Sequence, residues 1–175
     1  MADRLFYADG VRATGTEKIM DLADVAKATF YRHFPSKDEL VLAYLEHRNN
    51  LFWDYIKQPK PPATIHEALR KIDTLVNHPD VGSCPFLRIA SEYPDPEHPF
   101  HCSVREHKDS LLEYLGKFLG NARKGKRSLA AELLTLIDGA LSIRLVYGAS
   151  RHVPLLSYAE AIIDSSPVAE SKVIR

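Results

Sequence analysis

Apolar residues recur at a helical period along almost the whole chain. This spacing favours helices because positions three and four residues apart share one helix face. No segment shows the alternation of apolar and polar residues that is typical of a half-buried strand. The chain is therefore expected to be all-α. The segments with helical spacing are 36–56, 63–76, 84–93, 104–122, 128–150 and 155–164.

Proline and charge divide and limit the chain further. The segment "KQPKPP" at 57–62 cannot continue a helix, because its prolines lack a donor and restrict the residues before them. It is expected to be a linker, and the tail after Ser165 is expected to fray. The 23 basic and 23 acidic side chains balance, so a charged partner would have to be met by a local patch.

The cysteine spacing and the hydropathy of the chain indicate its cellular location. Cys84 and Cys102 have no paired spacing, and no segment approaches the roughly 20 apolar residues that cross a bilayer. We expect a cytoplasmic protein that spans no membrane and needs no cofactor. In "HPFHC", His98, His101 and Cys102 are ligand types for a metal, but a fourth ligand is missing, so no metal site is expected.

Local signals predict three short helices at the N-terminus. "MADRLFYADG" reads as the last turns of a helix closed by Gly10 in the left-handed conformation. Thr14 stands three residues before Glu17, a capping-box spacing that predicts a helix from Thr14 to Leu22. Asp24 falls in the following turn, where a residue tolerant of positive φ is needed, and the next helix begins at residue 25 or 26.

The stretch "VAKATFYRHF" at 25–34 contains no acidic residue and lies between two acidic segments. On a helical wheel Phe30 and Phe34 share one face, which leaves Lys27, Tyr31 and Arg32 on the flank and the opposite face. A helix of this kind can enter the major groove of DNA, where basic side chains reach bases and hydroxyls reach phosphates. Ser36 and Glu39 repeat the capping-box spacing, so a long helix is expected to start there.

The segment "FYADGVRATGTEKIMDLADVAKATFYRHFPSKDEL" resembles the DNA-binding domain of the TetR family of bacterial transcriptional regulators. The resemblance implies a helix-turn-helix domain over residues 1–48, with its first helix truncated. It also implies a helical effector-binding and dimerisation domain over 49–175. By resemblance, the DNA contacts are Lys27, Ala28, Thr29, Tyr31, Arg32 and His33 in the recognition helix, with Thr14, Thr16 and Lys37 binding phosphate at neighbouring helix starts.

The chain departs from the family pattern in two places. The family usually has glycine in the turn where this chain has Asp24, which adds a negative charge near DNA. The family's first helix usually begins about a dozen residues earlier, often after a basic lead-in. Both departures bear on affinity rather than on the kind of function.

Residues 129–149 are apolar on nearly every side and so need cover on every side. In a chain this short, a second copy can provide that cover. The resemblance likewise implies a homodimer, formed through the helices at about 127–149 and 153–165 as a two-fold four-helix interface. The alternative is that the first of these helices is simply a buried core helix of a monomer.

The segment 82–115 mixes aromatic side chains with a few polar ones, which are the ingredients of an apolar ligand pocket. A ligand-responsive member of the family would place its small-molecule effector among these helices. The candidate lining residues are Phe86, Glu92, His107, Tyr114, Asp138, Arg144 and Tyr147. Each of them could equally be an ordinary core or loop residue.

Together these expectations describe a repressor that binds a palindromic DNA operator as a dimer and is released by an effector. An enzyme would need a nucleophile with its base, a carboxylate pair in a cleft, or a glycine loop for a cofactor, and no telling spacing of that kind is present. The alternative function is a helical interaction adaptor that does not bind DNA.

Overall fold

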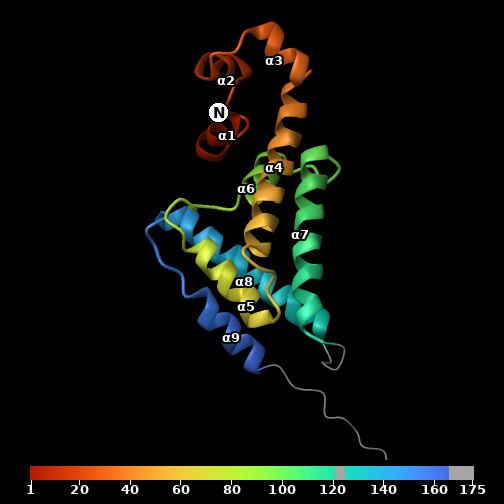
Figure 1. The fold of residues 1–175 in the computed structure, drawn as a ribbon, viewed down its shortest axis with the longest axis vertical. Coiled ribbons are helices and arrows are strands. Elements are labelled where there is room, and N and C mark those ends of the chain that lie inside the picture. Colours follow the sequence, from red (N-terminus) through yellow and green to blue (C-terminus); the bar gives the residue numbers. More distant parts are fainter. Residues whose placement is uncertain (121–124, 166–175) are drawn as a thin grey trace, which may run out of the picture. The chain divides into compact units, whose positions relative to one another are not determined.

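The computed structural model describes residues 1–120 and 125–165, which form nine α-helices and no strand (Figure 1). The prediction of an all-α chain is confirmed. The prediction for the tail after Ser165 lies outside the described residues. The helices are α1 Ala2–Asp9, α2 Thr16–Ala23, α3 Lys27–His33, α4 Lys37–Lys57, α5 Ile65–Val76, α6 Pro85–Glu92, α7 Pro99–Phe118, α8 Lys126–Tyr147 and α9 Leu155–Ser165.

The chain packs as two compact units. Unit 1 consists of Met1–Asp54 and Pro85–His107, and unit 2 combines Tyr55–Cys84 with the described part of Lys108–Arg175. Helix α6 thus packs with the N-terminal helices, although 27 residues separate it from the end of α4 along the chain. In the part of the chain that the structure describes, no helix is long and apolar enough to cross a membrane.

Unit 1 is built on contacts of α1 with α4. The ring of Phe6 meets that of Tyr44 edge-on, with 5.4 Å between centroids. Burial raises the pKa of Tyr44 to about 12, because a phenolate there would lose its hydration. One turn further along α4, Arg48 forms an ion pair with Asp3 at 2.7 Å, and its guanidinium lies 4.5 Å from the ring centre of Tyr7.

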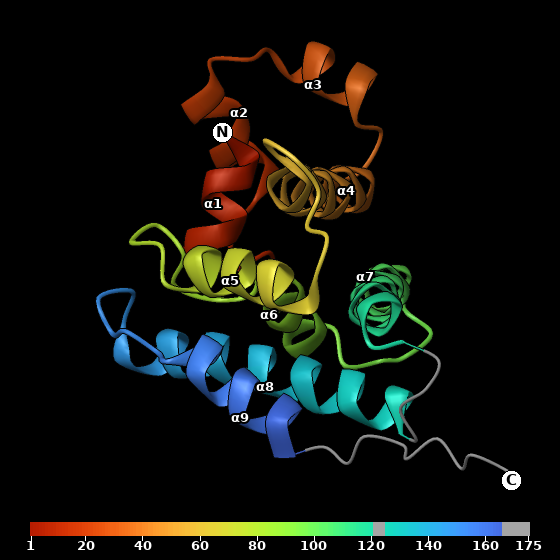
Figure 2. The same cartoon turned by 60° about the horizontal axis from the view of Figure 1, so that its bottom comes forward.

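In unit 2, helices α5, α8 and α9 pack together, and they lie side by side in both views (Figures 1 and 2). Asn77, at the end of α5, donates to the carbonyl of Val153 at 2.9 Å and accepts from the amide of the same residue at 2.8 Å. Asp73 accepts from the amide of Leu156 at 3.2 Å, which satisfies a free donor in the first turn of α9. These bonds fix the start of α9 against α5.

The proline linker after α4 is held by one lysine. The ammonium group of Lys71 in α5 donates to the carbonyl oxygens of Ile56 at 2.8 Å, Gln58 at 2.5 Å and Lys60 at 2.9 Å. The last carbonyls of a helix have no partner within it, and a cation near them is favourable. The predicted linker is thus anchored to unit 2 by its backbone.

Several local predictions are confirmed. Asp24 has φ 51° and ψ 47°, the left-handed conformation expected for the turn. The amide of Glu39 donates to the hydroxyl of Ser36 at 3.1 Å, as a capping box requires.

Other local predictions are wrong. Helix α2 begins at Thr16 after Gly15, and the hydroxyl of Thr14 is fully buried and donates to the carbonyl of Gly10 at 2.7 Å. Thr14 and Glu17 therefore do not form a capping box. Gly10 has a positive φ of 89°, but its ψ of 161° lies outside the left-handed helical region. Helix α7 begins at Pro99, earlier than its apolar spacing suggested, because proline fits the first helical position, where no amide is needed.

Helix α8 is covered on one side only. Leu133, Ile137 and Ala140 are buried, whereas Leu145 is 55% exposed and Val146 is 73% exposed. An apolar face therefore remains open in the last turns of α8.

Arg144 holds the C-terminal end of α8. Its side chain is buried, and its guanidinium donates to the carbonyls of Val81 at 2.8 Å, Arg151 at 2.8 Å and His78 at 2.6 Å. The three carbonyls come from the two loops that flank this end of the helix. One planar side chain therefore donates to three backbone acceptors.

Replacing Arg144 with leucine is expected to lower the free energy of unfolding by about 2 to 4 kcal/mol, because the acceptors lose their donor. Chemical denaturation measures this loss. The same replacement at Arg127, an exposed residue of the same helix, is the control and should change the free energy by less than about 0.5 kcal/mol. Equal effects of the two substitutions would contradict the assigned role of Arg144.

Candidate nucleic-acid interface

Helices α2 and α3 are joined by a tight turn at residues 24–26. The amides of Asp24 and Val25 donate to the carbonyls of Asp21 and Met20 at 3.3 and 3.1 Å, which closes the end of α2. Ala26 then takes an extended conformation and α3 begins at Lys27. Two short helices joined by a three-residue turn have the proportions of a helix-turn-helix.

The inner side of α3 is apolar. The Phe30 ring is 6% exposed, and its centroid lies 6.0 Å from that of Phe34. Phe34 follows the last residue of α3 and has an extended backbone, with φ −128°. A largely apolar cavity of about 510 Å³ adjoins this side, and Thr29 and His33 help to line it together with Phe30. Thr29 and His33 thus border this cavity, Thr29 half-buried and His33 exposed.

The outer side of α3 is open and cationic. Lys27, Ala28 and Arg32 are exposed, and Tyr31 is 37% exposed. The sequence of the helix, "KATFYRH", contains no carboxylate. The hydroxyl of Tyr31 lies 3.4 Å from that of Thr16, the first residue of α2. The start of α2 and the outer side of α3 therefore belong to one surface.

The expected phosphate contacts divide into two groups. Thr16 and Lys37 are the first residues of α2 and α4, where free amides and the helix dipole favour anions. Both side chains are half-buried. Thr14 differs, because its hydroxyl is fully buried on the carbonyl of Gly10, so its side chain is not placed to meet a phosphate.

The residues predicted to line an effector pocket are divided between the two units. Three of them, Phe86, Glu92 and His107, belong to unit 1. The rings of Phe86 and His107 stack in parallel, 3.7 Å apart, and Nδ1 of His107 lies 2.8 Å from the side-chain oxygen of Asn49. Glu92 instead accepts hydrogen bonds from the backbone amides of Val11 and Arg12, at 3.2 and 2.6 Å.

The other four predicted effector residues belong to unit 2. Asp138 forms an ion pair with Lys108 at 2.5 Å, and Arg144 is engaged by backbone carbonyls as described above. Tyr147 is 70% exposed. Burial raises the pKa of Tyr114.

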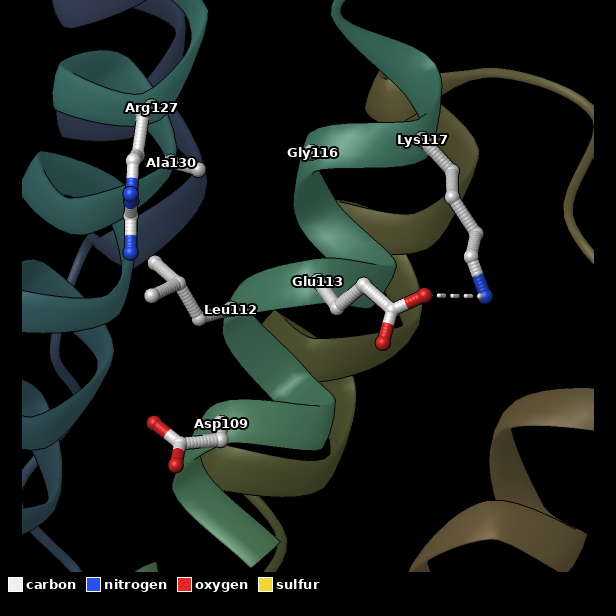
Figure 3. A pocket seen from close by; sticks show the side chains of 7 residues that line it. All are labelled: Asp109, Leu112, Glu113, Gly116, Lys117, Arg127 and Ala130. Atoms are coloured by element: carbon white, nitrogen blue, oxygen red, sulfur yellow. Dashed lines mark ion pairs between the residues drawn. The ribbon is translucent and has the colours of Figure 1, made fainter. Parts of the chain in front are cut away.

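Unit 2 contains an open cavity of about 630 Å³ between α7 and α8 (Figure 3). Its lining carries two carboxylates and two cationic groups, and Glu113 and Lys117 form an ion pair at 3.4 Å. None of the seven predicted effector residues lines this cavity. The lining residues are Asp109, Leu112, Glu113, Gly116, Lys117, Arg127 and Ala130.

The side chains of "HPFHC" do not converge on a common point. Nδ1 of His98 accepts from the amide of Phe100 at 3.2 Å, and Nδ1 of His101 lies 3.0 Å from the carbonyl of Tyr93. Cys102 faces the carbonyl of Pro96 at 3.7 Å. Among the residues described, no group of three histidine, cysteine or carboxylate side chains is placed to hold a metal ion.

The sequence analysis did not identify Arg88 as a residue that supports the helix-turn-helix, and it predicted that Glu92 lines an effector pocket. Arg88 donates to the carbonyls of Tyr7 and Ala8, at the end of α1. The spacing of a basic and an acidic residue by four positions on one helix was a weak signal, because it usually indicates a pair on the helix surface. Nothing in the sequence placed α6 beside α1.

Comparison with known proteins agrees with this geometry. Residues 1–44 match the family model described as "Bacterial regulatory proteins, tetR family". An HTH-type transcriptional regulator from Bacillus subtilis is 25% identical over 148 residues, which is 81% of this chain and 50% of that protein. The chain thus spans about half the length of this curated relative.

Solved structures extend the similarity along the chain. A TetR-type transcriptional regulator from Streptomyces avermitilis is 25% identical, with a TM-score of 0.78 over 95% of this chain and 94% of that one. A TetR-family transcriptional regulator from Streptomyces coelicolor is 30% identical, with a TM-score of 0.83 over 94% of this chain and 85% of that one. Because this identity extends over most of both chains and the N-terminal residues match the family model, the chain belongs to the TetR family of bacterial transcriptional regulators.

Proposed function

We propose that the chain is a transcriptional repressor that binds a palindromic DNA operator as a homodimer and is released by a small-molecule effector. The family consists of transcription regulators and not of enzymes. The observation that carries the proposal is the pairing, on one seven-residue helix, of a buried Phe30 ring with an exposed cationic side.

The proposed DNA contacts follow from that arrangement. Lys27, Tyr31 and Arg32 are open to the solvent on α3 and can reach base edges or phosphates, and the small side chain of Ala28 lets the backbone approach. Thr16 and Lys37 would bind phosphate at the starts of α2 and α4. The proposed contacts at Thr29 and His33 would come from the inner edge of α3. We leave Thr14 out of the contact set because its side chain is buried.

Dimerisation is proposed through α8 and α9. The last turns of α8 expose a group of large apolar side chains, and Tyr158 of the neighbouring α9 is 54% exposed. An exposed apolar surface of this kind favours association with a second copy. Two copies with recognition helices about 34 to 36 Å apart would read successive major grooves of a palindrome. The exposed side chains on α8 are Ile143, Leu145, Val146 and Tyr147.

Release by an effector is proposed to use α4. This helix contributes its residues up to Asp54 to unit 1 and those from Tyr55 onward to unit 2. A rigid element shared in this way can pass a displacement from a ligand to the DNA-binding helices. Coupling of this sort is typically about 1 to 3 kcal/mol, which changes operator affinity by roughly fivefold to 150-fold.

The DNA-binding proposal predicts that the protein binds a fragment of its own upstream region saturably and with strong dependence on salt. Lys27→Ala and Tyr31→Ala are each expected to weaken this binding about tenfold or more, because each removes a direct contact. Fluorescence anisotropy at fixed salt gives the affinities. Lys117→Ala removes an exposed cation of α7 and is the matched control, which should bind like the unsubstituted protein.

One result would argue against DNA binding, and a second would argue against α3 as the helix that binds DNA. An interaction adaptor would show no saturable binding to any genomic fragment. Equal losses for Lys27→Ala and Lys117→Ala would mean that overall charge, and not α3, attracts the DNA.

The dimer proposal predicts that Val146→Glu raises the dissociation constant of the dimer at least about tenfold, because it places a charge in an apolar interface. Sedimentation analysis over a range of concentrations measures this constant. Leu51→Glu, a matched change at another exposed leucine (47% exposed), should leave the dimer intact. A dimer unaffected by Val146→Glu would place the interface elsewhere.

A further inference from the structure

Two side chains of α6, one helical turn apart, form hydrogen bonds with the backbone at the end of α1 and in the connection to α2. Arg88 donates to the carbonyls of Tyr7 and Ala8, the second at 3.3 Å. Glu92 accepts from the amide of Val11 at 3.2 Å through Oε1 and from that of Arg12 at 2.6 Å through Oε2. We call Arg88 and Glu92 the α6 clamp.

The charges of the clamp match the backbone that they meet. The last carbonyls of α1 have no partner within the helix and carry partial negative charge, so a guanidinium is favoured there. The amides of Val11 and Arg12 lie just beyond the helix, and each of them donates to one carboxylate oxygen of Glu92. Hydrogen bonds to charged groups are about twice as strong as those between neutral groups.

Gly10 lies between the two halves of the clamp and makes it possible. Its φ of +89° is a conformation that side chains disfavour. A Cβ atom built on Gly10 would lie 2.8 Å from Oε1 of Glu92. A side chain at this position would therefore displace the carboxylate of Glu92 and strain the backbone.

Between the clamp and α2, burial and a hydrogen bond also fix the chain. Val11, whose amide binds Glu92, is fully buried, and the hydroxyl of Thr14 donates to the carbonyl of Gly10 at 2.7 Å. Thr16, the first residue of α2, follows two residues later. The connection from α1 to α2 is thus held at Val11, Arg12 and Thr14.

We propose that Arg88 and Glu92 are positioning residues for DNA reading, which set the orientation of α2 and α3 by fixing the α1–α2 connection, without touching DNA themselves. This inference rests on the proposed DNA-binding function. A displacement of α6 would reach the reading helices through these bonds.

Hydrogen exchange tests the clamp without DNA. In Glu92→Gln, one of the two acceptor oxygens becomes an NH₂ group that faces an amide donor. The backbone amide hydrogens of residues 8–16 are expected to exchange at least about tenfold faster, while the exchange rates of the amides in α5 and α9 stay unchanged. Glu97→Gln, a change at an exposed carboxylate five residues away, should leave exchange unchanged throughout. Unaltered exchange of residues 8–16 in Glu92→Gln would overturn the clamp.

DNA affinity tests the positioning role. Glu92→Gln is expected to bind the operator fragment at least about fivefold more weakly, with unchanged affinity for non-specific DNA. The reason is that misplaced α2 and α3 keep the charge that attracts any DNA, but their side chains no longer align with the base edges of the operator. A merely destabilised protein would lose both affinities. If Glu92→Gln fails to fold, Arg88→Lys, which keeps the charge but loses the fork of donors, is measured in its place.

The outcomes separate this inference from the proposed function. Operator affinity equal to that of the unsubstituted protein would overturn the positioning role and leave the proposed DNA binding intact. Absence of operator binding by the unsubstituted protein would overturn the proposed function, and hydrogen exchange would then decide the clamp alone.

Discussion

Burial of the Phe30 ring is the contact on which the proposed DNA-reading surface depends. A helix of seven residues does not persist in water by itself, because nucleation is costly and few hydrogen bonds repay it. Helix α3 therefore exists because its inner side is packed. The same packing directs Lys27, Tyr31 and Arg32 to the solvent. The stability of α3 and the exposure of its cationic side to solvent thus both follow from the burial of Phe30.

Charged side chains hold three irregular segments of the described chain in the same manner. Lys71 holds the proline linker, Arg144 holds the loops beside α8, and the α6 clamp holds the α1–α2 connection. In each place the backbone groups lack a helical partner and need one from elsewhere. One or two long side chains of a helix supply it. The loops are thereby tied to helices, so movement of a helix would be passed on.

Local chemistry accounts for the predictions that were confirmed. Asp24 tolerates the left-handed turn and Ser36 caps the start of α4, and both effects act within four residues. The predicted capping box at Thr14 was wrong because α2 begins at Thr16 with Gly15 as its N-cap, and the hydroxyl of Thr14 donates to the carbonyl of Gly10 instead. The helical wheel also gave only relative directions. Phe34 lies beyond the end of α3, so the wheel did not show that Thr29 and His33 border the cavity beside Phe30.

The sequence by itself determined that the chain is helical, where its turns fall, and which short helix carries exposed positive charge, because period, proline, glycine and capping residues act over a few positions. Only the tertiary structure decided that α6 lies against α1, and that Glu92, Arg88 and Arg144 form hydrogen bonds with the backbone. A charged side chain finds its partner through space, and residues 11 and 92 become neighbours only when the helices between them have packed.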